Sequence, residues 1–279
     1  MSTEPPTIPT RPRAFLRWAG SKRQLLPQIA KYWRPDFRRY IEPFCGSASL
    51  FFDLAPPKAC LSDINADLVE TLRAVQLWPD TVSECLARLN TDKTSYYVIR
   101  AQHPSNLPPT ERAARFIYLN LLCFNGLYRV NQKGDFNVPY GSKQRKVLIT
   151  GIGMRAVSRA LETADLMTRD FEEAIADADV GDFIYLDPPY ATSDARVFTE
   201  YHVDTFASKD LDRLRSALAS ADRRGVKFVL SYAETTELHD LSAGWSVERV
   251  KTRRNIAGFT GSRRFVDEVL ISNCELQHD

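Results

Sequence analysis

The sequence predicts an α/β fold in which a doubly wound, mostly parallel sheet has helices on both faces and carries an inserted, mainly helical module. Three observations support this prediction. Short apolar segments alternate with longer stretches of 3.6-residue periodicity, a pattern typical of parallel sheets with crossover helices. Residues 78–150 break the alternation. The length of 279 residues leaves room for a core domain with such an insertion.

Six segments have the length and composition of buried strands. They are residues 39–44 (RYIEPF), 58–64 (KACLSDI), 164–171 (ADLMTRDF), 182–188 (DFIYLDP), 227–232 (KFVLSY) and 267–273 (DEVLISN). The clearest helix spans residues 210–225 (DLDRLRSALASADRRG), with its apolar side chains on one side and Gly225 as a stop signal. A strand follows, so we expect this helix to be a right-handed crossover between parallel strands.

Residues 78–150 form the expected insertion. A helical pattern over residues 110–128 (TERAARFIYLNLLCFNGLY) precedes a polar stretch over residues 129–146 (RVNQKGDFNVPYGSKQRK), in which Gly134 and Gly141 indicate turns. We therefore divide the chain into a disordered lead (1–13), a core domain (14–77 and 151–279) and an inserted module (78–150). The lead is rich in proline and threonine and lacks the apolar centre of a signal peptide.

Composition favours a cytoplasmic protein without a structural metal. The chain is 44% hydrophobic and 26% charged, and its apolar stretches are far shorter than a membrane span requires. Five cysteines are odd in number and show no close-pair spacing, so we expect buried, reduced thiols. No membrane association is indicated.

Basic residues are unevenly distributed, although the net charge is only +2. The first forty residues hold nine lysines and arginines against Glu4 and Asp36, and two further groups occur over residues 129–146 and 249–264. If the fold brings these groups together, they form an electrostatic footprint for phosphates. Any one group taken alone is better explained as solvated surface charge.

Two motifs suggest an adenosine-bearing cofactor. Residues 40–52 (YIEPFCGSASLFF) form a strand followed by a small-residue loop, where Gly46 would let a ligand approach the backbone. Asp63 follows the next strand at the spacing at which an acidic group binds ribose hydroxyls. An ordinary tight turn at Gly46 and a helix N-cap by Ser62, Asp63 or Asn65 remain the alternatives.

The segment FIYLDPPY, residues 183–190, ends a strand with two prolines that cannot continue it. Asp187 and the carbonyl of Pro188 can accept hydrogen bonds from one planar amine, and Tyr190 offers a ring on which a base can stack. A base amine needs such acceptors because its lone pair is delocalised into the ring. A simple turn capped by Asp187 is the competing interpretation.

Six motifs in this order resemble the Dam-type (alpha) group of S-adenosylmethionine-dependent DNA adenine-N6 methyltransferases. They are FLRWAGSK (15–22), YIEPFCGSAS (40–49), SDIN (62–65), FNGLYRVNQKGDFNVPYG (124–141), DPPY (187–190) and RRNIAGFTGSRRFVDEVLISN (253–273). The resemblance implies a Rossmann-like methyltransferase sheet in which residues 78–150 are the target-recognition, DNA-binding domain. It also implies S-adenosylmethionine as cofactor, double-stranded DNA as partner, and transfer to the N6 amine of a flipped adenine.

The same resemblance implies roles for individual residues. The catalytic motif is matched by Asp187, Pro188, Pro189 and Tyr190. Cofactor contacts are implied for Trp18, Lys22, Phe44, Gly46, Ser47, Asp63, Asp170, Phe171 and Asp187.

Contacts with DNA are expected in the turn-rich part of the insertion. The candidates are Arg129, Asn131, Lys133, Asn137 and Lys143, with phosphate contact preferred over base reading. Ser142 stands where GATC-reading relatives have an arginine that can grip guanine, so GATC is not the expected site. Residues 251–264 (KTRRNIAGFTGSRR) are either a second backbone clamp or a solvated loop.

Three other functions stay open from the residues alone. The alternatives are an RNA methyltransferase, a protein-glutamine methyltransferase and a catalytically silent DNA-binding relative. Asp187 counts against glutamine methylation, which more often goes with asparagine at that position. A companion restriction endonuclease is a candidate partner that the sequence leaves open.

Overall fold

The computed structural model describes residues 12–18, 22, 24–141, 149, 151–190, 206–235, 241–255 and 263–274, with the backbone alone at 252–255 and 263–267. Several predictions therefore lie outside the described residues. These are the lead over residues 1–11, the roles of Ser142 and Lys143, and the side chains of most of the 251–264 segment.

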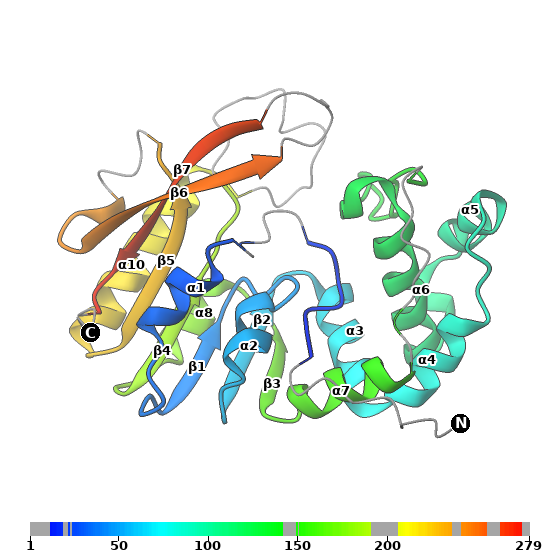
Figure 1. Ribbon diagram of the computed structural model, residues 1–279, viewed down its shortest axis with the longest axis horizontal. Helices are drawn as coiled ribbons and strands as arrows, with labels where there is room; N and C mark the ends of the chain where they lie inside the picture. Colours follow the sequence, from blue (N-terminus) through cyan, green and yellow to red (C-terminus); the bar gives the residue numbers. More distant parts are fainter. Residues whose placement is uncertain are drawn as a thin grey trace, which may run out of the picture.

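The described strands form one sheet in the order β3-β2-β1-β4-β5-β7-β6 (Figure 1). Their bounds are β1 Arg39–Glu42, β2 Ala59–Asp63, β3 Ala164–Thr168, β4 Asp182–Leu186, β5 Lys227–Ala233, β6 Ser246–Asn255 and β7 Arg263–Ser272. The first five strands in this order are parallel, whereas β7 is antiparallel to both β5 and β6. All six predicted strands are confirmed. The prediction missed β6, which is highly charged because it lies at the edge of the sheet.

Helices cover both faces of this sheet, as predicted. Their bounds are α1 Leu26–Ile29, α2 Ser49–Leu54, α3 Ala66–Leu77, α4 Pro79–Ala87, α5 Lys93–Ala101, α6 Pro109–Leu122, α7 Gly151–Leu161, α8 Phe171–Ala176 and α10 Ser208–Arg223. Short 3₁₀ turns span η1 Ala30–Tyr32, η2 Pro104–Asn106 and η3 Phe124–Gly126. The predicted helix over 210–225 is α10, and Gly225 follows it with a φ of 81°.

Successive side chains along the strands point to opposite faces of the sheet and pack into two separate hydrophobic cores. Tyr40 and Phe183 point into one core, which α2, α3, α6 and α7 cover. Ile41 and Ile184, their neighbours in the chain, point into the other, which α8 and α10 cover. Both faces are therefore buried, as expected for parallel strands that read as continuous apolar runs.

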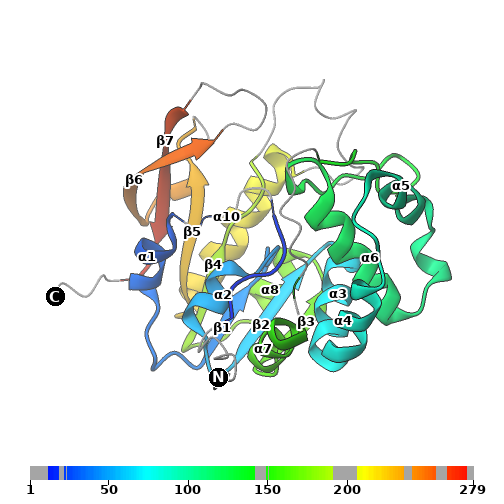
Figure 2. The ribbon, with the colours of Figure 1, turned by 45° about the vertical axis from the view of Figure 1, so that its right-hand side comes forward.

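Helices α4 to α6 gather at the end of the molecule opposite β6 and β7 (Figures 1 and 2). They pack on the sheet domain: α6 contacts α3 and α4, and α7 also lies against α3 and α4. Val82, Tyr96 and Ile117 belong to the same buried cluster as Tyr40. The mainly helical character of residues 79–122 agrees with the predicted insertion, while its boundaries and its role in target recognition stay predictions.

After α6 the chain turns back on itself over residues 123–141. Bridges pair Cys123 with Tyr140 and Val130 with Phe136, so this segment forms a narrow antiparallel loop. No helix within the described part of the chain is long and apolar enough to cross a membrane. All five cysteines are free thiols, of which Cys45, Cys60 and Cys123 are buried.

Candidate active site

The predicted catalytic motif, residues 187–190, lies directly beyond the carboxyl end of β4. Strand β4 ends at Leu186, after which Pro188 is buried, Pro189 is exposed and Tyr190 is half-buried. The Asp187 side chain is 23% exposed. One oxygen, Oδ1, accepts a 3.1 Å hydrogen bond from Ser231 of β5. Through Ser231, strand β5 therefore fixes the Asp187 carboxylate at the carboxyl edge of the sheet.

One ammonium group and one hydroxyl group influence the pKa of Asp187. Burial raises its pKa to about 6, while the Lys22 ammonium and the Ser231 hydrogen bond act in the opposite direction. The Lys22 Nζ atom lies 3.5 Å from Asp187 Oδ1. At neutral pH the side chain is thus mostly a carboxylate that accepts hydrogen bonds and is a weak base.

Lys22 connects the catalytic motif to the C-terminal strand β7. Its ammonium donates to Glu268 Oε2 at 2.8 Å and to the Tyr190 hydroxyl at 2.7 Å. The resemblance implied a cofactor contact for Lys22, and the observed partners belong to the catalytic motif and β7. Glu268 was not predicted. The only signal for it in the sequence is an acidic residue inside the apolar run DEVLIS.

The first loop and the second strand are joined by Asp63. Its Oδ2 accepts from the Gly46 amide and its Oδ1 from the Asn65 amide, both at 3.0 Å. Burial raises the pKa of Asp63, and these hydrogen bonds oppose the rise. Asn65, rather than Ser62 or Asp63, caps α3 by accepting from the Leu68 amide.

Gly46 has a φ of 47° and lies against the ring of Trp18. A Cβ atom at this position would be 2.5 Å from Trp18 Cδ1, so glycine is required for the close approach. Ser47 is buried next to it, with its hydroxyl 3.0 Å from that of Ser49. Four predicted cofactor residues, Trp18, Gly46, Ser47 and Asp63, are thus brought together.

An aromatic wall stands beside this loop. The half-buried Phe44 stacks on Phe171 with ring centroids 5.3 Å apart, and Phe206 meets Phe44 edge-on. Asp170 caps α8 and pairs with Arg213 at 2.9 Å, and the Arg213 guanidinium lies 4.8 Å from the Phe171 ring centroid. Phe206 and Arg213 were not predicted, because only the tertiary fold places α10 here.

Glu42 is a buried acid between the two halves of the site. It is 3% exposed and accepts a 2.9 Å hydrogen bond from the Tyr40 hydroxyl. Burial raises its pKa to about 8, and the nearby carboxylates of Asp187 and Asp63 contribute. A neutral Glu42 avoids a third negative charge in this region.

The four described candidates for DNA contact share one turn. Arg129 Nε donates to Asn137 Oδ1 at 2.7 Å, which fixes both side chains. Asn131 Oδ1 accepts from the amides of Lys133 and Asp135, both at 2.9 Å. Lys133 is exposed at the tip. On the adjoining turn, the ring of Phe124 is 42% exposed, although its place at the end of an apolar run suggests a core residue.

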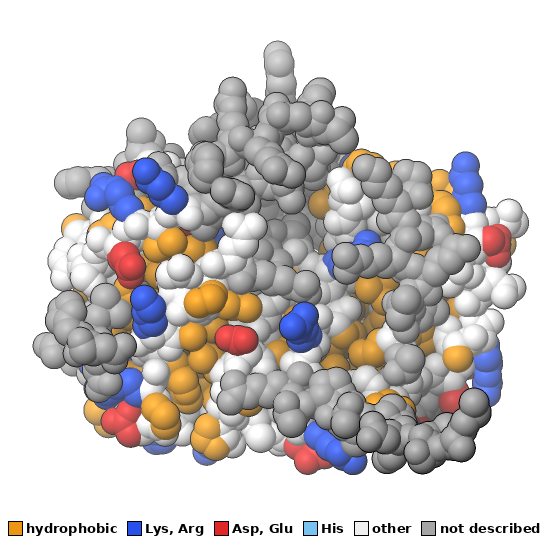
Figure 3. All heavy atoms as spheres, in the orientation of Figure 1, with side chains coloured by type: hydrophobic (Ala, Val, Ile, Leu, Met, Phe, Trp, Pro, Cys, Tyr) orange, Lys and Arg blue, Asp and Glu red, His pale blue; other side chains and the backbone are white. Residues whose placement is uncertain are grey.

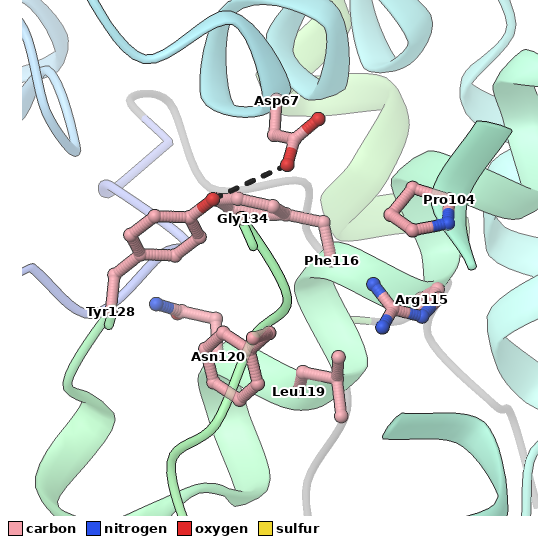
Figure 4. Close-up of a pocket in the computed structure, with 9 residues that line it drawn as sticks. Asp67, Pro104, Arg115, Phe116, Leu119, Asn120, Tyr128 and Gly134 are labelled. Carbon is pink, nitrogen blue, oxygen red and sulfur yellow. Dashed lines mark hydrogen bonds between the residues drawn. The ribbon is translucent and has the colours of Figure 1, made fainter. Parts of the chain in front are cut away.

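Tyr128 connects the turn-rich segment to Trp18 and to helix α3. Its ring stacks on Trp18 at 5.8 Å, and its hydroxyl donates to Asp67 Oδ2 at 3.2 Å. Figure 4 shows this hydrogen bond at the edge of a small pocket that Phe116, Asn120 and Arg115 of α6 also line. The segment that holds the DNA-contact candidates therefore touches Trp18, a predicted cofactor residue, through Tyr128.

Basic side chains do not form one large patch on the face shown in Figure 3. The described lysines and arginines lie there singly or in small groups, with acidic residues nearby. The predicted common footprint for phosphates also involves residues outside the described part of the chain, so it stays a prediction. Within the described part, no cluster of His, Cys, Asp or Glu could hold a metal ion.

The chain is similar to known enzymes that act on adenine. A model of the D12 class N6 adenine-specific DNA methyltransferases matches residues 18–256, and the chain belongs to this family. It is a site-specific DNA adenine methyltransferase. This assignment selects DNA adenine over RNA and protein glutamine as the substrate class.

Several characterised proteins are similar over nearly the full length. The type II methyltransferase M1.LlaDCHI of Lactococcus lactis subsp. cremoris is 33% identical, covering 94% of this chain and 95% of its own. The type II methyltransferase M.MjaIII of Methanocaldococcus jannaschii is 33% identical over 94% and 99%. The DNA adenine methylase of Escherichia coli K12 is 31% identical over 92% and 94%.

Proposed function

We propose that this enzyme transfers a methyl group from S-adenosylmethionine to the N6 amine of an adenine that is flipped out of duplex DNA. The observation that carries the proposal is the position of Asp187, Pro188 and Tyr190 at the carboxyl end of β4, next to the loop of β1 and Asp63 of β2. Ligands of doubly wound sheets bind at this edge. The family assignment supports the same reaction.

The residues at the ends of β1 and β2 fit the cofactor. Each oxygen of Asp63 accepts one backbone amide and retains a further lone pair for a ribose hydroxyl. Phe44, half-buried on Phe171, offers an aromatic surface for an adenine ring, and Asp170 can accept from its amine. Trp18, Gly46 and Ser47 would border the methionine part. When bound, S-adenosylmethionine supplies a methyl group on a positively charged sulfur.

The target amine would be held by Asp187 Oδ and the Pro188 carbonyl. These two acceptors would localise the nitrogen lone pair and orient it toward the methyl group of the bound cofactor, an arrangement suited to direct displacement without a covalent enzyme intermediate. Acceleration comes from alignment and from electrostatic stabilisation of the amine as it becomes positive. The nitrogen becomes acidic only as its bond to the methyl group forms, so Asp187 can accept the proton, or pass it to water, without being a strong base.

The adenine must leave the duplex because its amine is inaccessible while paired. Flipping costs a few kcal/mol. Stacking on the Tyr190 ring would offset part of this cost, since base–aromatic contacts contribute roughly 1–3 kcal/mol in single-strand binders. The half-buried position of Tyr190 leaves part of its ring accessible.

DNA contact is proposed for residues 78–150 as the target-recognition domain. Arg129, Lys133 and Asn137 of the turn, and Lys143 beyond the described residues, would contact phosphates or base edges. Asn131 uses its side-chain oxygen within the turn and would act by shaping it. Because Ser142 cannot replace a bidentate arginine on guanine, we propose a target other than GATC.

The remaining proposals concern context. We expect a cytoplasmic enzyme that needs no metal ion, since the proposed displacement requires none. A companion restriction endonuclease remains a candidate partner, because two relatives are named type II methyltransferases.

Methyl transfer to unmethylated duplex DNA tests the proposed function. The enzyme is incubated with radiolabelled S-adenosylmethionine, and the DNA is digested to nucleosides for mass spectrometry and mapped at base resolution. N6-methyladenine at one short recurring sequence other than GATC is the expected result. Label in N4-methylcytosine, or no label despite cofactor binding, would contradict the proposal.

A further inference from the structure

Glu268 lies deep in the sheet, within reach of the catalytic motif. It is on β7, opposite Ala233 of β5 and Val250 of β6, and is 1% exposed. A buried carboxylate is costly unless it is paired and hydrogen-bonded. The partners described for Glu268 come from two other parts of the chain, Lys22 and Tyr190.

These partners make a compact arrangement. Glu268 Oε2 accepts from the Lys22 ammonium at 2.8 Å, and Oε1 accepts from the Tyr190 hydroxyl at 3.0 Å. The Lys22 ammonium also donates to the Tyr190 hydroxyl at 2.7 Å. The three groups therefore bond to one another, and a shift of any one breaks two contacts.

Two carboxylates compete for the single ammonium of Lys22. Its Nζ atom lies 2.8 Å from Glu268 Oε2 and 3.5 Å from Asp187 Oδ1. The pair with Glu268 is the shorter and the more deeply buried of the two. It is therefore the stronger pair, because Coulomb attraction increases as the distance and the dielectric constant decrease. Asp187 is thereby the weaker partner of Lys22: their ion pair is 3.5 Å long, and the same Oδ1 atom also accepts from Ser231.

We infer that Glu268 is a positioning residue for methyl transfer: it fixes the ring of Tyr190 and holds Lys22 closer to itself than to Asp187, so that the ion pair of Lys22 with Asp187 stays long and Asp187 can accept from the target amine. This inference rests on the proposed roles of Asp187 and Tyr190. Without the charge of Glu268, Lys22 would move closer to Asp187 and compete with the target amine for its carboxylate. Tyr190 would also lose the acceptor that sets its orientation.

The neighbouring strand offers a matched control. Tyr32 donates a 2.8 Å hydrogen bond to Glu248 Oε2 of β6, which is the same chemical pair as Tyr190 and Glu268. Neither Tyr32 nor Glu248 belongs to the catalytic motif. If the Tyr190–Glu268 pair is merely structural, breaking either pair should change kcat and the melting temperature alike. If Glu268 is a positioning residue, only the variants of the Tyr190–Glu268 pair should lower kcat.

The test compares the variants Glu268→Gln and Tyr190→Phe with their double variant, and Glu248→Gln with Tyr32→Phe as controls. Melting temperature, kcat, KM for duplex DNA and cofactor affinity are measured for each. Fluorescence of 2-aminopurine, placed at the adenine that the wild-type enzyme methylates, reports base flipping. If the wild-type enzyme methylates no duplex DNA, the proposed function itself has failed, which separates that outcome from failure of this inference.

We expect Glu268→Gln to lower kcat by roughly tenfold or more with cofactor affinity nearly unchanged, and to reduce the 2-aminopurine signal. Tyr190→Phe should cost roughly threefold to tenfold alone and almost nothing further in the Glu268→Gln background, because both variants break the same contact. The two control variants should keep kcat within about twofold of the wild type.

Wild-type kcat in Glu268→Gln, or independent multiplication of the two losses, would overturn the inference. If Glu268→Gln does not fold, the inference is tested by comparing Tyr190→Phe with its control, Tyr32→Phe. Loss of kcat in Tyr190→Phe alone, at an unchanged melting temperature, supports positioning, whereas equal effects of both variants overturn it.

Discussion

The amide of Gly46 donates a 3.0 Å hydrogen bond to Oδ2 of Asp63, which ties the loop after β1 to the end of β2. The two strands are paired in parallel, so their carboxyl ends meet at one edge of the sheet. The hydrogen bond gives this edge a fixed shape before any ligand arrives. Preorganisation of this kind reduces the entropic cost of binding.

Gly46→Ala is expected to weaken S-adenosylmethionine binding by roughly tenfold or more, about 1.4 kcal/mol. The new Cβ would lie 2.5 Å from Trp18 and displace its ring. Gly134→Ala is the control, since Gly134 also has a positive φ of 83° but no atom within 4 Å of an added Cβ. Calorimetric titration distinguishes the two: equal cofactor affinities would show that Trp18 does not border the cofactor site.

The pH dependence of turnover should report Asp187. Its protonated form cannot offer the same acceptor, so kcat is expected to fall about tenfold per pH unit below a midpoint near 6. The Lys22 ammonium lowers the pKa of Asp187, and Lys22→Gln should therefore move this midpoint to higher pH. An acid limb that is identical in the two proteins would mean that another group titrates.

Glu42 should make the folded protein less stable as pH rises. Its pKa is raised from 4.5 to about 8, so it is protonated when folded and ionised when unfolded between these values. Unfolding then releases a proton, and the free energy of unfolding decreases as pH rises through this window. Glu42→Gln removes this contribution, so the variant should gain about 3 to 4 kcal/mol relative to wild type between pH 5 and pH 8.

Denaturant unfolding at several pH values measures this gain. The exposed Glu84 of α4 provides the control variant Glu84→Gln, whose difference from wild type should stay constant with pH. A constant difference for Glu42→Gln as well would show that the buried acid does not hold its proton.

The sheet could be predicted from sequence because its central strands are buried on both faces and read as apolar runs. Strand β6 was not predicted, because charged residues such as Arg249 and Lys251, which suit an exposed edge, obscure the apolar pattern of a strand. The sequence also did not predict that helices α4 to α6 share a hydrophobic core with the sheet. Packing between distant helices leaves no periodic signal that distinguishes an independent core from a joint one.

The site was predictable where its residues are adjacent in the chain. Asp187 and Tyr190 flank two consecutive prolines, and Asp63 follows its strand at a recognisable distance. Glu268 and Arg213 act through contacts over long separations, which a single sequence does not specify. Glu42 was overlooked because one acidic residue in a strand gives no indication of whether it is buried.

The most direct test of the central claim is single-turnover methyl transfer by Asp187→Ala and Asp187→Asn on duplex DNA, with S-adenosylmethionine affinity measured in parallel. The account predicts that the rate of transfer falls by at least about 100-fold in both variants while cofactor affinity changes only a few-fold. A rate close to that of the wild-type enzyme would contradict the assignment of Asp187 as the acceptor for the target amine.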